Sequence, residues 1–575
     1  MSDAQTVKRF GSWRLSLVWV ALALAVLALL WKLFTLLLVD RDFLQGQGDA
    51  RTIRTEPLVA HRGMITDRNG EPLAISTPVK SIWVNPREIA GDQNVVRQLA
   101  RSLQLNEESL LASVEANAER EFLYVRRRMP PAEADAVLAM SLPGVYARQE
   151  YQRYYPQGEV TAHVLGFSNV DDIGQEGLEL AFDEWLKGVP GRQQVIKDRR
   201  GRIIRQLDTI QTAQPGNTLA LSIDFRLQNL AYKELKAEFV HRDARAASAV
   251  VLDVKTGEVL AMVNQPSFNP HNRASLADFG ALRNRSVTDL FEPGSTLKPF
   301  TAIAALESGL YDGSTIISTH PGRMRVGRDV VQDRGRNFGD VTLEGMLVNS
   351  SNIASAKVAL AVGHEALRDV LLRVGFGENP ASGFPGERAG VMPNHRIWHD
   401  IELATLSFGY GMSTSTLQLA QAYSVIANGG LRVPVTLLRD GNQMAGAAEP
   451  QRVVDAGVIA QVQNMLEAVV DPDQGGFDGA SVPFYSIAGK TGTARVVGAS
   501  GYEANLHNSM FAGYVPADDP RIVVIIIVNE PKGAEHYGSQ VAAPVFARIA
   551  SGAMRLLEVT PDAIDPSRIM TLSAR

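Results

Sequence analysis

The chain has 575 residues, of which 45% are hydrophobic and 21% are charged; this composition is globular, and the length suggests about two to four folded units. The formal net charge of −5 argues against a protein that binds nucleic acid through a general basic surface. No cysteine is present, which excludes disulfides, thiolate metal sites and cysteine nucleophiles.

An apolar run near the N-terminus predicts a membrane anchor. Residues 15–31 carry no charge, and residues 33–39 resume the apolar character after Lys32. Together they are long enough to span a bilayer. No other run of this length and apolarity occurs in the sequence, so we expect a single-pass topology with the anchor at residues 15–39.

The charges that flank the anchor predict its orientation. Lys8, Arg9 and Arg14 precede the apolar run, so the positive-inside rule places residues 1–14 in the cytoplasm and the rest of the chain outside. A cleaved signal peptide is the alternative, because Ala23-Leu24-Ala25 resembles a processing site. That site lies inside the apolar run, which favours an uncleaved anchor.

The part of the chain that follows, residues 40–215, has the composition of a strand-rich, non-catalytic domain. Asn69-Gly70 is a turn signal ahead of a strand expected at residues 72–75. Residues 92–139 form a polar stretch that we interpret as helical. Residues 143–207 are rich in glycine, arginine and turn-forming residues.

A second large domain begins after the turn at residues 214–217. Residues 218–223 predict a strand and residues 226–239 a helix. We interpret residues 216–560 as this domain and residues 561–575 as a C-terminal tail.

The elements expected in the second domain predict one antiparallel sheet flanked by helices, in an α+β fold. Early strands form a hairpin, helices follow, and late strands complete the sheet before a final helix. The expected strands are residues 249–254, 258–263, 485–497, 510–514 and 522–528. The expected helices are residues 295–307, 343–361, 417–427 and 543–557.

Ser295 and Lys298 form a Ser-x-x-Lys motif at the start of a predicted helix. Pro293-Gly294 is a helix-entry signal, and Pro299 is tolerated in a first turn because its missing N–H would have no intrahelical partner. Positions i and i+3 share a helix face, so the amine can reach the hydroxyl. A free lysine is protonated at neutral pH, so the site must lower the pKa of Lys298 by desolvation or by a nearby cation if Lys298 is to act as base.

A second motif, Ser350-Ser351-Asn352, falls between two halves of a helical pattern, residues 343–348 and 353–360. A loop at this place can aim side chains into a cleft. Ser350 would move a proton between Lys298 and a leaving amine, and the Asn352 amide would hold the substrate backbone. The motif alone is weak, since other Ser-x-Asn sequences occur in the chain.

A third motif, Lys490-Thr491-Gly492-Thr493, lies on a predicted strand whose glycine lets a ligand backbone approach closely. The two threonine hydroxyls would bind a substrate carboxylate beside the Lys490 charge, which is also the cation expected near Lys298. The N–H groups of Ser295 and Thr493 would form an oxyanion hole. In this order, the three motifs supply the parts of acyl transfer through a serine ester.

With these motifs the chain resembles the class B penicillin-binding proteins, and among them the division-type peptidoglycan D,D-transpeptidases. The likeness covers nearly the whole chain. Besides the anchor and the motifs, it rests on Arg62-Gly63, Asp67-Arg68-Asn69-Gly70, Arg153-Tyr154-Tyr155-Pro156, Gly177-Leu178-Glu179, Phe291-Glu292-Pro293-Gly294-Ser295, Ser407-Phe408-Gly409-Tyr410-Gly411 and the segment at residues 488–495.

The resemblance implies a pedestal or dimerisation domain at residues 40–215 and a penicillin-binding transpeptidase domain at residues 216–560. Ser295 would be acylated by the penultimate D-Ala of a stem pentapeptide, with release of the terminal D-Ala, and the amine of a neighbouring stem would resolve the ester into a cross-link. β-Lactams would be trapped as stable acyl-enzymes. The implied catalytic residues are Ser295, Lys298, Ser350, Asn352 and Lys490. The implied substrate-binding residues are Thr491, Gly492, Thr493, Tyr410 and Arg495.

The resemblance also implies a role in septal cell-wall synthesis at the inner membrane, with the catalytic domain in the periplasm. An FtsW-type glycan polymerase and other division proteins would be partners. No cofactor, metal or nucleic acid is implied. His395 and His399 have the spacing of zinc ligands on a helix but lack the intervening glutamate of a metalloprotease, so we interpret them as structural. His507, His536 and Tyr537 are candidates for an aromatic wall near the site.

Other functions share part of this signature. An accessory copy of the division enzyme and an elongation-type homologue both stay open, although the Phe-Gly-Tyr-Gly stretch favours the division type. A β-lactamase would need to activate water, and no Glu-x-x-Leu-Asn segment is found. A β-lactam sensor would need a signalling domain, and a catalytically silent division scaffold would be expected to lose Lys298 or Lys490.

Overall fold

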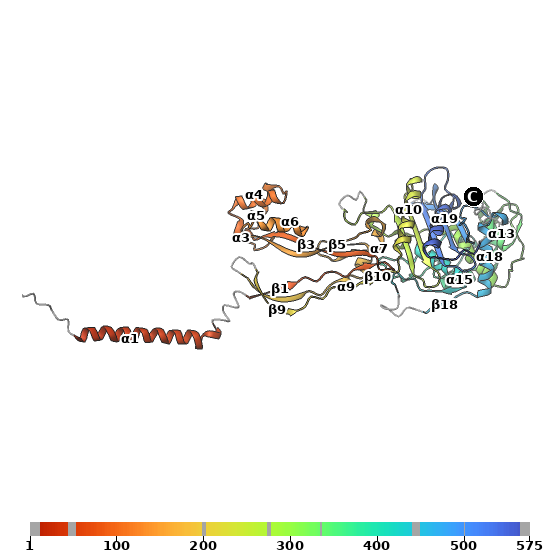
Figure 1. The fold of residues 1–575 in the computed structure, drawn as a ribbon. Coiled ribbons are helices and arrows are strands. Elements are labelled where there is room, and N and C mark those ends of the chain that lie inside the picture. Colours follow the sequence, from red (N-terminus) through yellow and green to blue (C-terminus); the bar gives the residue numbers. More distant parts are fainter. Residues whose placement is uncertain are drawn as a thin grey trace, which may run out of the picture. The chain divides into compact units, whose positions relative to one another are not determined.

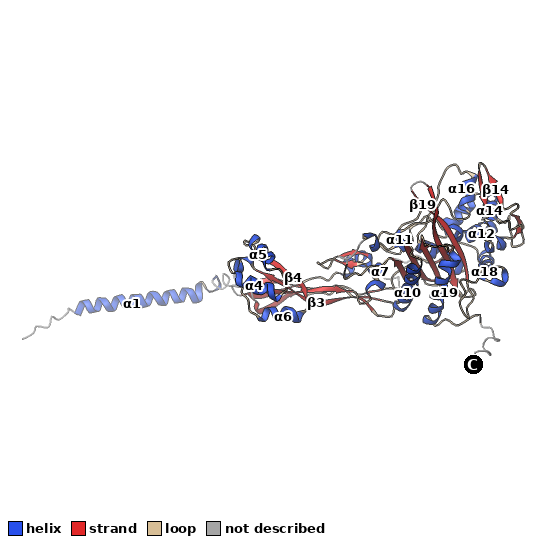
Figure 2. Ribbon diagram, turned by 90° about the horizontal axis from the view of Figure 1, so that it is seen from above, coloured by secondary structure: helices blue, strands red, loops and turns tan. Residues whose placement is uncertain are grey.

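The computed structural model describes residues 12–43, 53–197, 203–272, 278–333, 336–439, 449–498 and 501–563. The chain forms two compact units, and each is built from separate stretches of sequence. The first unit comprises residues 1–60, 80–150 and 188–215. The second comprises residues 61–79, 151–187 and 216–575. Figures 1 and 2 show the elements along the chain.

The N-terminal helix is apolar between Arg14 and Lys32. Helix α1 spans Ser12–Phe34 and continues as one π-helical segment, η1, over Thr35–Val39. Within the described ranges, Trp13–Val39 is the one helix long and apolar enough to cross a membrane, and none of it is buried against protein. An apolar helix without a protein core around it suits a bilayer. This finding supports a single-pass membrane protein.

Among the residues described, the rest of the first unit includes a three-stranded sheet, parts of the strands β3 and β5 with β4, and four short helices. Strands β1, β8 and β9 form an antiparallel sheet, and β3 pairs with β4 and β5. The strands are β1 (Ile53–Leu58), β3 (Pro72–Val84), β4 (Leu123–Met129), β5 (Val145–Tyr154), β8 (Gly191–Lys197) and β9 (Ile203–Gln211). The helices are α3 (Pro86–Ile89), α4 (Gln93–Ser102), α5 (Glu107–Ala116) and α6 (Pro131–Ala139).

The prediction of a helical stretch over residues 92–139 is wrong at β4. This segment is a strand because it pairs with β3, where Ile82 lies opposite Arg126 and Trp83 lies opposite Tyr124. The pairing partner is about forty positions away in the sequence. Strand formation depends on such cross-strand packing more than on local composition.

Short elements at the N-terminal side of the second unit surround a buried ion-pair network. Arg62 Nε and Arg153 Nε each lie 2.6 Å from a different oxygen of the Glu179 carboxylate, and all three side chains are almost fully buried. Arg153 also donates to the Gly63 carbonyl at 2.7 Å. The surrounding elements are β2 (Ile65–Thr66), η2 (Gly158–Val160), α7 (Ala162–Leu165), β6 (Phe167–Ser168), β7 (Gly174–Glu176), α8 (Gly177–Ala181), α9 (Asp183–Leu186) and β10 (Leu219–Ala220).

A five-stranded antiparallel sheet forms the centre of the second unit, as predicted. Its order is β12-β11-β21-β20-β19. Its strands are β11 (Ala246–Asp253), β12 (Val259–Gln265), β19 (Ala488–Gly498), β20 (Gly501–Val515) and β21 (Ile522–Asn529). Helices α10 (Phe225–His241) and α19 (Gly538–Leu556) pack on the sheet, as does α17 (Thr416–Ala427).

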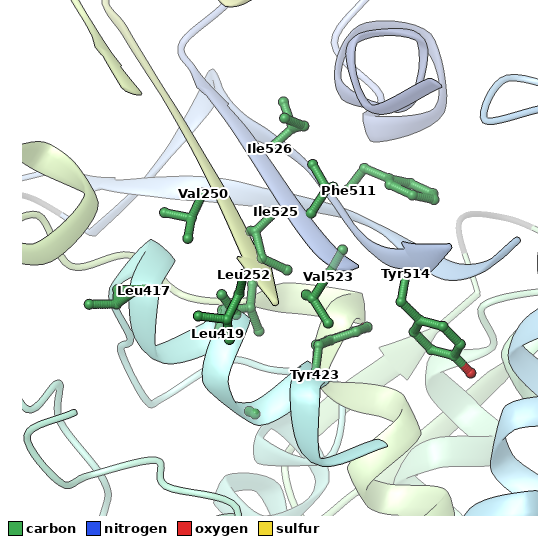
Figure 3. Packing of buried hydrophobic residues seen from close by; sticks show 14 of the residues in the cluster. Val250, Leu252, Leu417, Leu419, Tyr423, Phe511, Tyr514, Val523, Ile525 and Ile526 are labelled. Atoms are coloured by element: carbon green, nitrogen blue, oxygen red, sulfur yellow. The ribbon is translucent and has the colours of Figure 1, made fainter. Parts of the chain in front are cut away.

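Buried side chains alternate between the two faces of this sheet. Leu252 of β11 and Ile525 of β21 point toward helix α17, which carries Leu419, and Phe511 of β20 points to the opposite face (Figure 3). There the Phe511 ring lies 4.6 Å from Phe546 of α19, measured between ring centroids. The sheet is therefore covered by helices on both faces, which fixes its edge strand β19 in place.

Further helices and two-stranded ribbons complete the second unit. The helices are η4 (Phe279–Leu282), α11 (Arg285–Thr288), η5 (Gly294–Leu297), α12 (Lys298–Glu307), α13 (Leu343–Val348), α14 (Asn352–Val362), α15 (His364–Arg373), α16 (Asp400–Leu406), α18 (Ala456–Val470) and η7 (Pro472–Gln474). The ribbons are β13 (Ile317–Ser318) with β16 (Asp340–Val341), β14 (Arg323–Val326) with β15 (Asp329–Gln332), and β17 (Leu431–Arg432) with β18 (Gln451–Arg452).

Candidate active site

Ser295 lies in a tight turn that leads into a buried helix. The turn is the 3-10 segment η5, and α12 begins directly after it at Lys298, with Pro299 in its first turn. Gly294 opens the turn with a φ of +53°, a conformation that glycine adopts without steric cost. Ser295 is 9% exposed and Lys298 is fully buried. The serine is thus at a helix entrance, as its sequence predicts.

Lys298 is the centre of the site. Its Nζ lies 3.1 Å from Ser295 Oγ and 3.2 Å from Ser350 Oγ. It donates to the Ser350 carbonyl oxygen at 2.6 Å and to Asn352 Oδ1 at 2.8 Å. A neutral amine has two N–H donors and one lone pair. When the carbonyl and amide oxygens accept both donors, the lone pair is left to face the two hydroxyls.

The Ser350-Ser351-Asn352 motif joins α13 to α14, as expected from the interrupted helical pattern. Ser350 has a φ of +55°, which is uncommon for a residue with a side chain. Ser351 is the N-cap of α14, and its Oγ accepts from the Ala354 N–H at 3.0 Å. The left-handed backbone at Ser350 turns the chain so that both its carbonyl and its hydroxyl reach Lys298.

The third motif lies on edge strand β19, which packs against the turn of the first motif. A β-carbon on Gly492 would lie 2.9 Å from Thr296 Cγ2 and 3.2 Å from the Pro293 oxygen. Only a glycine lets the strand come this close to the turn. The chain thereby brings residues 490–493 beside Ser295, although nearly two hundred positions separate them.

The polar side chains of β19 are held in place by neighbours. Lys490 is 1% exposed, and its Nζ lies 3.4 Å from the Thr491 carbonyl oxygen and 3.5 Å from Thr491 Oγ1. Thr493 Oγ1 accepts from the Gly538 N–H at 3.0 Å. Because that bond uses an acceptor position, the Thr493 hydroxyl still has its hydrogen to donate.

Tyr410 and Arg495 lie on the segments that border these motifs. Tyr410 packs edge-on against Tyr502, with ring centroids 5.6 Å apart. Arg495 is exposed and lies opposite His507 in the pairing of β19 with β20. His507 in turn stacks on His536 at 4.3 Å. These side chains are next to the three motifs, whereas Ser295, Ser350 and Asn352 each contact Lys298 directly.

Two acidic residues that contact the motifs or the segments beside them were not singled out from the sequence alone. Glu292 accepts from the Gly411 N–H at 2.8 Å and from the Tyr502 hydroxyl at 3.0 Å, and burial raises the pKa of its carboxyl. Asp333 accepts from the backbone and side chain of the second motif. Glu292 could have been identified from the sequence, because it lies in the Phe-Glu-Pro-Gly-Ser segment beside Ser295. No local sequence pattern indicates Asp333.

Family comparisons cover both parts of the chain. Residues 247–551 match the penicillin-binding protein transpeptidase domain, and residues 57–221 match the penicillin-binding protein dimerisation domain. The chain is 44% identical to the probable peptidoglycan D,D-transpeptidase PbpC of Pseudomonas aeruginosa over 97% of both chains. It is 41% identical to the peptidoglycan D,D-transpeptidase FtsI of Escherichia coli K12, over 96% of this chain and 94% of the relative.

Solved structures show the same likeness. Penicillin-binding protein 3 of Mycobacterium tuberculosis complexed with aztreonam is 29% identical and has a TM-score of 0.67, covering 88% of this chain and 98% of that one. The transpeptidase domain of Burkholderia pseudomallei penicillin-binding protein 3 is 38% identical and has a TM-score of 0.54, covering 60% of this chain and 97% of that one.

Proposed function

The chain belongs to the class B penicillin-binding proteins, and on this premise we propose that Ser295 is the nucleophile with which it cross-links peptidoglycan stem peptides. It is a serine-type D,D-transpeptidase of septal cell-wall synthesis and a target of β-lactams. The observation that carries the assignment of Ser295 is the 3.1 Å separation between its Oγ and the buried Lys298 Nζ.

Acylation follows from that contact. Neutral Lys298 accepts the proton of Ser295 as its Oγ attacks the carbonyl carbon of the penultimate D-Ala. The N–H groups of Ser295 and Thr493 stabilise the oxyanion, and loss of one such donor typically costs about 10² to 10³ in rate. The proton passes through Ser350 Oγ, 3.2 Å from Lys298 Nζ, to the departing amine. The peptide bond breaks, the serine ester forms, and D-Ala leaves.

Transfer reverses the proton path. The amine of a neighbouring stem attacks the ester carbonyl, its proton returns to Ser295 Oγ through the same groups, and a new amide bond joins the two stems. A β-lactam acylates Ser295 in the same way, but its leaving amine stays attached to the acyl group after ring opening. The departing group therefore occupies the place that an acceptor amine needs, and the ester persists.

The side chains of β19 suit recognition of a C-terminal carboxylate. We assign this role to the hydroxyls of Thr491 and Thr493 together with the charge of Lys490, while Gly492 admits the substrate backbone. The Gly538 N–H occupies an acceptor position of Thr493 Oγ1, which favours donation of the hydroxyl hydrogen to the ligand. Asn352 contacts the substrate backbone. Tyr410 and Arg495 bind more distant parts of the stem peptide.

We also propose the location and the partners. Residues 1–14 are cytoplasmic, residues 15–39 anchor the chain in the inner membrane, and the catalytic domain is periplasmic. Three basic residues before the apolar run at residues 15–31 support this orientation. Residues 40–215 form the pedestal, residues 216–560 the transpeptidase domain and residues 561–575 a tail. The anchor and pedestal contact an FtsW-type glycan polymerase and other division proteins.

The nucleophile is tested by covalent labelling of the full-length protein in detergent. We expect a fluorescent penicillin to modify one residue, Ser295, and the Ser295→Ala variant to stay unlabelled with an unchanged thermal melt. Peptide mapping that places the adduct on another residue contradicts the assignment. Rapid release of hydrolysed penicillin would instead indicate a β-lactamase.

An accessory copy of the division enzyme is the second candidate, because the chain matches PbpC and FtsI at similar identities, 44% and 41%. Depletion in the host followed by microscopy separates the possibilities. Filaments indicate an essential septal enzyme, round cells an elongation enzyme, and normal cells an accessory copy.

A further inference from the structure

Asp333 is a buried carboxylate at the end of the β14–β15 hairpin. It is 3% exposed. One carboxylate oxygen accepts from Ser351 Oγ at 2.6 Å. The other accepts from the backbone N–H of Asn352 at 2.6 Å and from that of Ile353 at 3.1 Å. One side chain therefore holds three donors of the second motif and of the first turn of α14.

The groups held by Asp333 are covalent neighbours of those that contact Lys298. Lys298 donates to the Ser350 carbonyl at 2.6 Å and to Asn352 Oδ1 at 2.8 Å. Ser351, the residue between them, binds Asp333 through its hydroxyl. A displacement of the Asp333 carboxylate would therefore move the two oxygens that orient the Lys298 amine.

The hairpin is itself fixed by packing. Val326 and Val331 of the hairpin join a small buried cluster with Ile353 and Ala356 of α14. At its end, the Gln332 carbonyl accepts from Asn352 Nδ2 at 3.4 Å, so the amide oxygen of Asn352 is turned toward Lys298. The hairpin and α14 thus form one rigid support for the second motif.

We infer that Asp333 is a positioning residue of the transpeptidase, which sets the orientation of Lys298 through Ser350 and Asn352. This inference rests on the proposed role of Ser295 and Lys298. Asp333 acts in two ways. Its hydrogen bonds hold the left-handed turn at Ser350, and its negative charge, one residue away from the Lys298 contacts, favours the charged form of the amine.

Two variants separate these actions. Asp333→Ala removes all three hydrogen bonds. Asp333→Asn keeps an acceptor for the two backbone N–H groups, and the Ser351 hydroxyl can rotate to accept from the new amide, so chiefly the charge is lost. Asp455 supplies a control for the loss of a helix cap, because this exposed side chain also holds the first turn of a helix, α18, by accepting from the N–H groups of Gly457 at 2.7 Å and Val458 at 3.2 Å.

The experiment measures penicillin acylation of the full-length protein by stopped flow, with the dissociation constant Kd and the acylation rate resolved separately. For Asp333→Ala we expect an acylation rate about 10²-fold lower, the cost of a small misplacement of a catalytic group, with Kd changed less than about threefold. Asp455→Ala is expected to lower Tm less, because its cap is exposed, and to acylate at the wild-type rate.

The pH–rate profile of Asp333→Asn distinguishes the proposed role from a purely structural one, because loss of a helix cap alone would not shift this profile. We expect the acid limb of its pH–rate profile to shift to lower pH, because loss of a nearby negative charge favours the neutral amine. The inference is overturned if Asp333→Ala is acylated at the wild-type rate, or if Asp455→Ala loses as much acylation rate as Asp333→Ala. It is also overturned if the pH–rate profile of Asp333→Asn is not shifted. A wild-type protein that is not acylated at Ser295 overturns the proposed function as well.

Discussion

Gly409 lies so close to the backbone of Gly294 that it has no room for a side chain. The Gly294 N–H donates to the Gly409 carbonyl at 3.1 Å, and a β-carbon on Gly409 would lie 2.1 Å from the Gly294 oxygen. Both have positive φ, +53° and +86°. The residue before the nucleophile is thus fixed to the loop that carries Tyr410.

We expect Gly409→Ala to displace the Ser295 turn and to lower the penicillin acylation rate about 10²-fold, while the protein stays folded. Gly411→Ala is the matched control, because Gly411 also has a positive φ, +79°, but a β-carbon there meets no atom within 4 Å. Labelling kinetics of both variants check the prediction. Equal rate losses would attribute the effect to backbone strain alone.

Lys298→Ala removes the group that we propose as acceptor of the serine proton. We expect acylation to fall about 10³-fold, within the range of about 10² to 10⁴ that one general base usually contributes, with the circular dichroism spectrum unchanged. Lys357 of α14 is the control, because its amine also donates to a backbone carbonyl, that of Ser318, at 2.6 Å. Lys357→Ala is expected to label normally, and residual labelling of Lys298→Ala near the wild-type rate would contradict the assigned role.

Ser350 combines a strained backbone with a functional hydroxyl, and two substitutions separate them. Both Ser350→Gly and Ser350→Ala remove the hydroxyl next to Lys298, so both are expected to slow transfer to an acceptor amine equally. Only the glycine relieves the left-handed φ, which favours its folded state over the alanine variant by about 1 kcal/mol. Thermal melts measure the effect on stability, and single-turnover assays measure the rate of transfer. A glycine variant that transfers faster than the alanine variant would argue against a role of the hydroxyl.

Glu179 neutralises two buried guanidinium groups. Glu179→Ala leaves Arg62 and Arg153 without their shared carboxylate, which is expected to cost about 3 to 5 kcal/mol and to lower Tm by about 6 °C or more. The half-exposed pair of Arg548 with Glu234, 2.6 Å apart, serves as comparison, and Glu234→Ala is expected to change Tm by less than about 2 °C. Similar shifts for the two variants would show that the buried network contributes little.

His163 predicts acid sensitivity of folding. Burial lowers the pKa of its imidazole to about 4, and its Nε2 lies 2.8 Å from the Ala281 carbonyl. The unfolded chain takes up a proton near pH 6.5, and the folded one does not until about pH 4. Stability is therefore lost as pH falls between these values, by up to about 3 kcal/mol.

The His163→Gln variant tests this pH dependence, since glutamine is neutral throughout and its amide can donate to the same carbonyl. We expect its Tm to change less than that of the wild type between pH 7 and pH 4.5. Parallel pH profiles of the two proteins would assign the acid sensitivity to other groups.

Local chemistry explains what could be predicted from the sequence. Ser295 and Lys298 are three positions apart, so helix geometry alone brings them together, and an uncharged run long enough for a bilayer identifies the anchor. The central antiparallel sheet could be predicted because its strands are apolar runs, which can be recognised in the sequence without knowing which strands pair. The strand β4 was missed because its pairing with β3 is not local.

The sequence by itself determined the apolar helix, the order of the three motifs and the closeness of Ser295 to Lys298. Only the tertiary structure decided that Ser350 and Asn352 meet Lys298 across 52 and 54 positions, and that Asp333 supports them. A hydrogen bond between distant residues leaves no periodic trace in the chain, because its geometry is set by the packing of the sheet, the hairpin and the helices around it.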